Sequence, residues 1–118
     1  MKIVINCCYG GFGLSDTALE MILNRKGIEW EKKLPDHEWG FSSYTRKDNP
    51  EETLEAHDFF TWDKRNDTIL VEVVEALGED AWGSYSELKV VEIPDEVDWE
   101  IVDYDGMEHV AERHRIWR

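Results

Sequence analysis

The chain has 118 residues, of which 42% are hydrophobic and 34% are charged, and its 27 Asp and Glu against 13 Lys and Arg give a net charge of −14. This length suits a single domain that buries a core without metal or disulfide support, and the composition excludes a disordered chain. No apolar run approaches the roughly 18 residues of a membrane span or resembles a secretory signal, so we expect a cytoplasmic protein with no membrane contact.

The acidic residues are unevenly distributed along the chain. Residues 1–35 hold five basic and four acidic residues, whereas residues 72–108 hold one basic and 13 acidic residues, for a segment charge of −12. The sign reverses at residues 109–118, which hold three arginines and one glutamate. Such a surface repels phosphate backbones, which excludes direct binding to duplex nucleic acid but leaves the two ends of the chain able to hold a small anion.

A strand and a glycine turn open the chain. The apolar run from Lys2 to Cys8 is typical of a central strand that is buried on both faces. Three glycines follow within four positions, and their missing Cβ atoms allow left-handed backbone or the close approach of a ligand. The residues of this turn are Tyr9, Gly10, Gly11, Phe12 and Gly13.

A helix follows the turn directly. Ser15 is a good N-cap for a helix from Asp16 to Lys26, and Gly27 is placed to end it. Because the first N–H groups of a helix lack partners, the junction of turn and helix suits an anion. The turn matches neither the phosphate loop nor the dinucleotide fingerprint, which needs a small residue where Asp16 stands. A structural turn and a ligand-contacting turn therefore both stay open.

The pattern weakens in the middle of the chain. Residues 28–35 alternate as a half-buried strand does, and residues 36–66 show no periodicity. We expect a long loop or lid that ends in an anchoring strand at Phe59 to Trp62.

The second half predicts one helix and then strands. Asn66 or Asp67 caps a helix from Thr68 to Leu77, and Gly78 ends it. Residues 88–93 and 97–103 have strand patterns and are expected to pair with each other.

Asp105-Gly106 is a turn signal, after which residues 107–117 fit either a short helix or a third hairpin strand. The order βαβ, long loop, αββ and a short C-terminal segment predicts an α+β fold, as a single small domain with a mixed β-sheet and two main helices.

Arginines and aromatic residues form the best candidate ligand constellation. Arg65, Arg113 and Arg115 offer planar forks for a carboxylate or phosphate. Five aromatic residues are candidates to stack a nucleobase: Tyr9, Phe12, Trp39, Trp62 and Trp117. The alternative, which an acidic chain favours, is that the aromatic rings fill the core and the arginines pair with Asp and Glu.

Signals for metal binding and catalysis are weak. His109 and His114 are five positions apart, where a helix would need four to place both on one face, and neither a metal nor another cofactor is predicted. Cys8 and Ser15 lack an identifiable histidine base, so an enzyme stays an open alternative that no residue pattern supports. Cys7 and Cys8 are adjacent and are expected to be buried thiols.

Four segments have a pattern that is typical of a known family: residues 1–6 with 8–15, Arg65-Asn66-Asp67, residues 88–94, and residues 104–115. In these segments the chain resembles a family of short phage and prophage proteins that are described without an activity, and the resemblance leaves out residues 29–58. It implies a phage origin and a location in the host cytosol, and it implies no activity.

Two functions from different classes fit these observations. The first is a small binding protein that captures an anionic small molecule, such as a nucleotide signal of host defence. Its predicted ligand-binding residues are Tyr9, Gly10, Gly11, Phe12, Gly13, Ser15, Arg65, Arg113 and Arg115. The alternative is an acidic inhibitor or adaptor that presents residues 72–108 to a basic host protein in place of DNA. Homo-oligomerisation stays open, because sites in small proteins often form between subunits.

Overall fold

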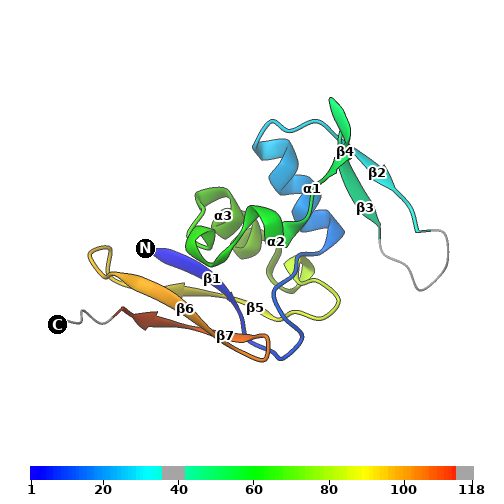
Figure 1. The fold of residues 1–118 in the computed structure, drawn as a ribbon. Helices are drawn as coiled ribbons and strands as arrows, with labels where there is room; N and C mark the ends of the chain where they lie inside the picture. Colours follow the sequence, from blue (N-terminus) through cyan, green and yellow to red (C-terminus); the bar gives the residue numbers. More distant parts are fainter. Residues whose placement is uncertain (36–41, 114–118) are drawn as a thin grey trace.

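The computed structural model describes residues 1–35 and 42–113, apart from the side chain of His57 (Figure 1). It has the α+β class and the two main helices expected from the sequence. The strands are β1 (Lys2–Asn6), β2 (Trp30–Lys33), β3 (Ser43–Arg46), β4 (Asn49–Thr53), β5 (Leu88–Glu92), β6 (Trp99–Tyr104) and β7 (Met107–Glu112). The helices are α1 (Asp16–Arg25), the short α2 (Ala56–Phe59) and α3 (Thr68–Leu77), with 3₁₀ turns η1 (Trp62–Lys64) and η2 (Gly78–Ala81).

The strands form three small sheets in place of the one mixed sheet predicted. Their orders are β1-β5, β2-β3-β4 and β6-β7, and every described ladder is antiparallel. The expected pairing of residues 88–93 with 97–103 is wrong, because β5 pairs with β1 and β6 pairs with β7. The Asp105-Gly106 turn is the reason: both residues have positive φ, at 52° and 93°, which is the backbone of a two-residue hairpin.

The hairpin also decides between the two interpretations of the C-terminal segment. Met107–Glu112 is the strand β7, so the hairpin alternative is correct for these residues and the helix is wrong. Residues 114–118, which belonged to the same predicted segment, lie outside the described residues.

Both main helices have the caps that the sequence predicted. Ser15 Oγ accepts a hydrogen bond from the N–H of Ala18 at 3.1 Å, and Asp67 Oδ1 accepts one from the N–H of Leu70 at 3.0 Å. Gly78 caps the end of α3 with a φ of 57°. These signals are local, because a cap needs only the residues of the first or last turn.

The predicted long loop is wrong for its described part. Residues 42–66 contain β3, β4, α2 and η1, and the anchoring strand at 59–62 is instead the end of α2 followed by η1. All five residues of β4 are exposed, so the strand carries no alternation for a pattern search to find. Phe60 nevertheless anchors the segment, since it is 1% exposed in the main core.

The core lies between the two main helices and the β1-β5 sheet. Its members include Val4, Ile22, Leu70 and Val73, all fully buried. A smaller cluster packs α1 against the β2-β3-β4 sheet, which extends away from the rest of the molecule (Figure 1). The radius of gyration is accordingly 15.5 Å, above the about 13.5 Å of a spherical domain of this length. Within the described ranges, no helix is long and apolar enough to cross a membrane.

A buried ion pair closes the second edge of β1. Arg65 Nη1 and Nη2 donate to the two carboxylate oxygens of Glu108 at 2.6 and 3.0 Å, and the two residues are 4% and 6% exposed. Arg65 Nε donates to the carbonyl of Phe60 at 2.7 Å. The N–H of Val4 donates to the Arg65 carbonyl, and the N–H of Asn6 donates to Glu108 Oε1, at 2.9 and 2.8 Å. Side-chain and loop groups thus take the place of a neighbouring strand.

Glu108→Ala should lower the free energy of unfolding by about 3–5 kcal/mol, because it leaves the two Nη groups of Arg65 and the Asn6 N–H buried without an acceptor. Glu112→Ala removes an exposed carboxylate from the same strand and should change stability by less than about 0.5 kcal/mol. Urea unfolding of both variants checks the prediction, and equal losses would contradict it.

Candidate functional site

The glycine turn packs against a second loop, residues 82–86, between η2 and β5. The N–H of Ser15 donates to the Ala81 carbonyl at 2.9 Å. The Gly13 carbonyl accepts from the N–H of Gly83 at 3.3 Å and from Ser86 Oγ at 2.8 Å. An isolated bridge joins Leu14 and Trp82. These bonds hold the two loops in one arrangement without a ligand.

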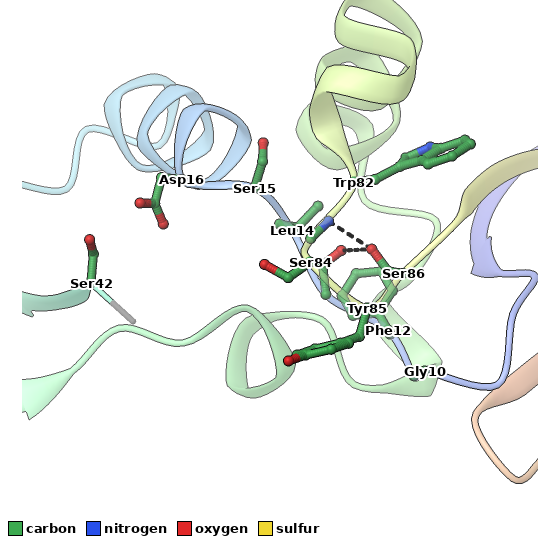
Figure 2. Close-up of a pocket in the computed structure, with 13 residues that line it drawn as sticks. Gly10, Phe12, Leu14, Ser15, Asp16, Ser42, Trp82, Ser84, Tyr85 and Ser86 are labelled. Atoms are coloured by element: carbon green, nitrogen blue, oxygen red, sulfur yellow. Dashed lines mark hydrogen bonds between the residues drawn. The ribbon is translucent and has the colours of Figure 1, made fainter. Parts of the chain in front are cut away.

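A cavity of about 550 Å³ lies between the two loops and the start of α1 (Figure 2). This volume is within the range of small-molecule sites. Its lining consists of Gly10, Gly11, Phe12, Gly13, Leu14, Ser15, Asp16, Ser42, Trp82, Gly83, Ser84, Tyr85 and Ser86.

The glycines around the turn differ in what requires them. A Cβ on Gly10 would lie 1.8 Å from the Tyr85 carbonyl oxygen, and one on Gly106 would lie 2.6 Å from that of Tyr9, so close packing requires both. Gly11 has a φ of 90°, which L residues rarely adopt. Gly13 has neither constraint, because its φ is not positive and a Cβ would meet no described atom within 4 Å.

Three polar side chains line the cavity and make few or no polar interactions with the described part of the chain. The hydroxyls of Ser42 and Ser84 make no hydrogen bond in the part of the chain that the structure describes. Asp16 engages Lys32 through one carboxylate oxygen, at 3.4 Å. In Figure 2 these three side chains surround a common space at the start of α1. They can donate to or accept from a polar ligand.

Ser15 and Ser86 have structural duties instead. Ser15 Oγ caps α1 and donates to the Asp80 carbonyl at 2.6 Å, while Ser86 Oγ joins Gly13 to Gly83. Ser15 and Ser86 therefore shape the cavity, while Asp16, Ser42 and Ser84 are the polar side chains available to a ligand.

Aromatic side chains supply the apolar part of the lining. The Phe12 ring stacks on the Arg65 guanidinium, whose Cζ lies 3.7 Å from the ring centroid. Tyr85 is 69% exposed. Trp82 lines the cavity, but in Figure 2 its indole points away from Asp16 and Ser42.

Five of the predicted ligand-binding residues come together at this cavity, and they are Gly10, Gly11, Phe12, Gly13 and Ser15. Tyr9 is exposed and does not belong to the lining.

The predicted arginines do not join the turn. Arg65 pairs with the buried Glu108 and is therefore not available to a ligand. Its guanidinium contacts the cavity wall through its stack on Phe12. Arg113 lies beside Asp98 and Glu100, away from this cavity. Arg115 lies outside the described residues, as do Trp39 and Trp117. Among the described residues, the side chains that line the cavity therefore carry a single charge, the negative charge of Asp16.

Residues 82–86 were missed as site residues. The signal that marks them is another glycine, Gly83, which follows Trp82 and precedes Ser84-Tyr85-Ser86 on the chain segment that joins a helix to a strand. The sequence alone does not show that the two glycine-containing loops meet, because that contact spans about 70 positions.

A second hollow of about 510 Å³ continues along α1 toward β3 and shares Asp16 and Ser42 with the first. Beside it, the Tyr44 hydroxyl donates to Glu20 at 2.7 Å, and burial together with this bond raises the pKa of Tyr44. Burial alone would lower the pKa of Lys32, but the carboxylates of Glu20 and Asp16 raise it overall. Lys32 therefore stays charged beside the carboxylate that faces the cavity.

The cysteines next to the turn are free thiols. Cys8 Sγ donates to the Tyr85 carbonyl at 3.1 Å. Burial raises the pKa of Cys7, which keeps it protonated and poorly nucleophilic. Residues 1–35 and 42–113 contain no group of three or more His, Cys, Asp or Glu side chains placed to hold a metal ion.

Comparison of the chain with protein-family models, curated proteins and solved structures finds no match.

The two glycines at positions 10 and 13 should respond in opposite ways to an added methyl group. Gly10→Ala should lower the free energy of unfolding by about 1–3 kcal/mol or more, since it overpacks the contact with Tyr85. Gly13→Ala should leave stability unchanged or slightly raised, because alanine reduces the entropy of the unfolded chain. Thermal and urea unfolding check both, and equal losses would contradict this assignment.

Proposed function

We propose that the protein binds a small molecule in the cavity formed by the glycine turn and residues 82–86. One observation carries the proposal: Gly13 is a glycine that neither backbone conformation nor packing requires, at the wall of a cavity of about 550 Å³. A ligand that approaches the backbone closely explains a glycine at this position.

The lining favours a polar ligand that contains a ring. The Asp16 carboxylate and two serine hydroxyls match hydroxyl or amine groups, and Phe12 and Tyr85 supply flat apolar surface. A nucleoside or a related sugar-bearing molecule has both features.

The structure offers fewer positive groups for a phosphate than the sequence suggested. The arginines expected to neutralise it lie elsewhere, and the N–H groups at the start of α1 are the remaining feature that favours an anion. The nucleotide signal of host defence thus stays a candidate that rests on the family resemblance to phage proteins, while the lining by itself favours an uncharged relative of such a molecule.

Gly13→Val should abolish ligand binding without unfolding the protein, because its side chain projects into the cavity. The measurement is calorimetry against adenosine, guanosine, their cyclic nucleotides and ADP-ribose. Ala76→Val is the matched control, since it adds bulk at an exposed position of α3 outside the cavity and should leave binding intact. Absence of heat with every member of this panel, or equal effects of the two valines, would refute the proposal.

Asp16→Asn should shift the preference of the cavity toward phosphate. In the unmodified protein we expect adenosine to bind at least as tightly as adenosine 5′-monophosphate, because Asp16 repels the phosphate. The Asn variant keeps the shape of the side chain, removes the charge that repels the phosphate and leaves Lys32 with Glu20 as its carboxylate partner, so the ratio should move toward the monophosphate by about three- to tenfold. An unchanged ratio would place the phosphate away from Asp16.

A further inference from the structure

A separate, smaller cleft of about 380 Å³ lies between η1 and β6. It is lined by Trp62, Asp63, Trp99, Glu100, Ile101 and Arg113. It shares no lining residue with the cavity at the glycine turn, so any ligand it holds is independent of the proposed function.

The cleft is held in place by the fold. Trp62 is 54% exposed, yet its Nε1 donates to Glu108 Oε2 at 3.3 Å, which ties the indole to the buried ion pair. Arg113 continues the β6-β7 hairpin through its N–H, which donates to the Asp98 carbonyl at 2.8 Å. An exposed tryptophan in a preformed cleft is the kind of residue on which protein interfaces concentrate their binding energy.

The charge of the cleft is negative and incompletely compensated. Asp63 and Glu100 line it, and Asp98 lies beside it. Arg113 approaches Glu100 and Asp98 at 3.7 and 3.8 Å, distances too long for hydrogen bonds, and its side chain is 57% exposed. The Glu100 carboxylate therefore has no close hydrogen-bond donor in the described residues.

We infer that this cleft binds an arginine side chain of a basic protein partner. The guanidinium would stack on the tryptophans and donate two parallel N–H bonds to the Glu100 carboxylate, which Arg113 approaches without a hydrogen bond. Arginine fits better than lysine, because its planar group stacks and binds a carboxylate through two parallel bonds.

The chemistry of the whole surface supports this choice of partner. The chain has a net charge of −14, and the segment 72–108, which includes β6, holds 13 acidic residues and one lysine. Such a field attracts a basic protein and repels nucleic acid. The cleft would supply the specific contact on a surface that otherwise attracts any cation.

Arg113 occupies the rim of the cleft as an intramolecular competitor. Its removal should therefore strengthen binding of the partner arginine, whereas removal of the Glu100 charge should weaken it. Effects of opposite sign at two neighbouring residues separate a built site from general electrostatic attraction.

The test is a titration of the protein with a blocked tetra-arginine peptide, followed by the tryptophan indole N–H signals in NMR spectra. The arginine peptide should bind about two- to fivefold more tightly than its tetra-lysine counterpart. Arg113→Gln should raise the affinity, and Glu100→Gln should lower it, each by about two- to fivefold.

Each variant has a control that changes the same charge on β5, outside the cleft. Lys89→Gln matches Arg113→Gln, and Glu92→Gln matches Glu100→Gln, and both controls should have smaller effects than their counterparts. Trp99→Leu, with its folding verified by unfolding curves, should remove the preference for arginine over lysine. Equal effects of variants and controls, a loss of affinity in Arg113→Gln, or equal binding of the two peptides would overturn the inference.

Discussion

The buried pair of Arg65 and Glu108 is the contact on which the other parts of this structure depend. It closes the free edge of β1, because Val4 and Asn6 donate their N–H groups to the Arg65 carbonyl and the Glu108 carboxylate. Burying two charges is costly, and such a pair contributes little net stability compared with an apolar replacement. The pair instead favours one arrangement of the chain, because any packing that separates the partners leaves a charge buried alone. The segment 60–66 and β7 are therefore held against β1 together.

The same pair contacts one lining residue of each candidate site. The Arg65 guanidinium stacks on Phe12, which belongs to the wall of the glycine-turn cavity. The Glu108 carboxylate accepts from the indole of Trp62, which lines the cleft between η1 and β6. An arginine that the sequence presented as a ligand contact therefore acts as a support for two surfaces. The polar groups left for recognition are those that the fold engages least. Ser42 and Ser84 at the cavity make no hydrogen bond within the described residues, and Asp16 at the cavity and Glu100 at the cleft make long ion pairs with Lys32 and Arg113.

The sequence predicted the features that depend on interactions between neighbouring residues, and it failed for those that depend on distant residues. The caps at Ser15 and Asp67 and the hairpin turn at Asp105 depend on neighbouring residues, so their patterns are visible in a short window. Strand pairing depends on distant residues. The prediction that residues 88–93 pair with the next strand was wrong because β5 pairs with β1, more than 80 positions away. The exposed strand β4 was missed because it has no buried face to impose alternation.

The amino-acid sequence alone determined the class of the fold, both main helices with their caps, and the presence of a glycine turn before the first of them. These features are set by backbone preferences and local hydrogen bonds, which act within a few residues. Only the tertiary structure decided which residues complete the cavity, and that Arg65 faces Glu108 instead of solvent. The two residues are 43 positions apart, so no short stretch of sequence shows that they meet. Each needs the other because a buried charge without a partner is costly.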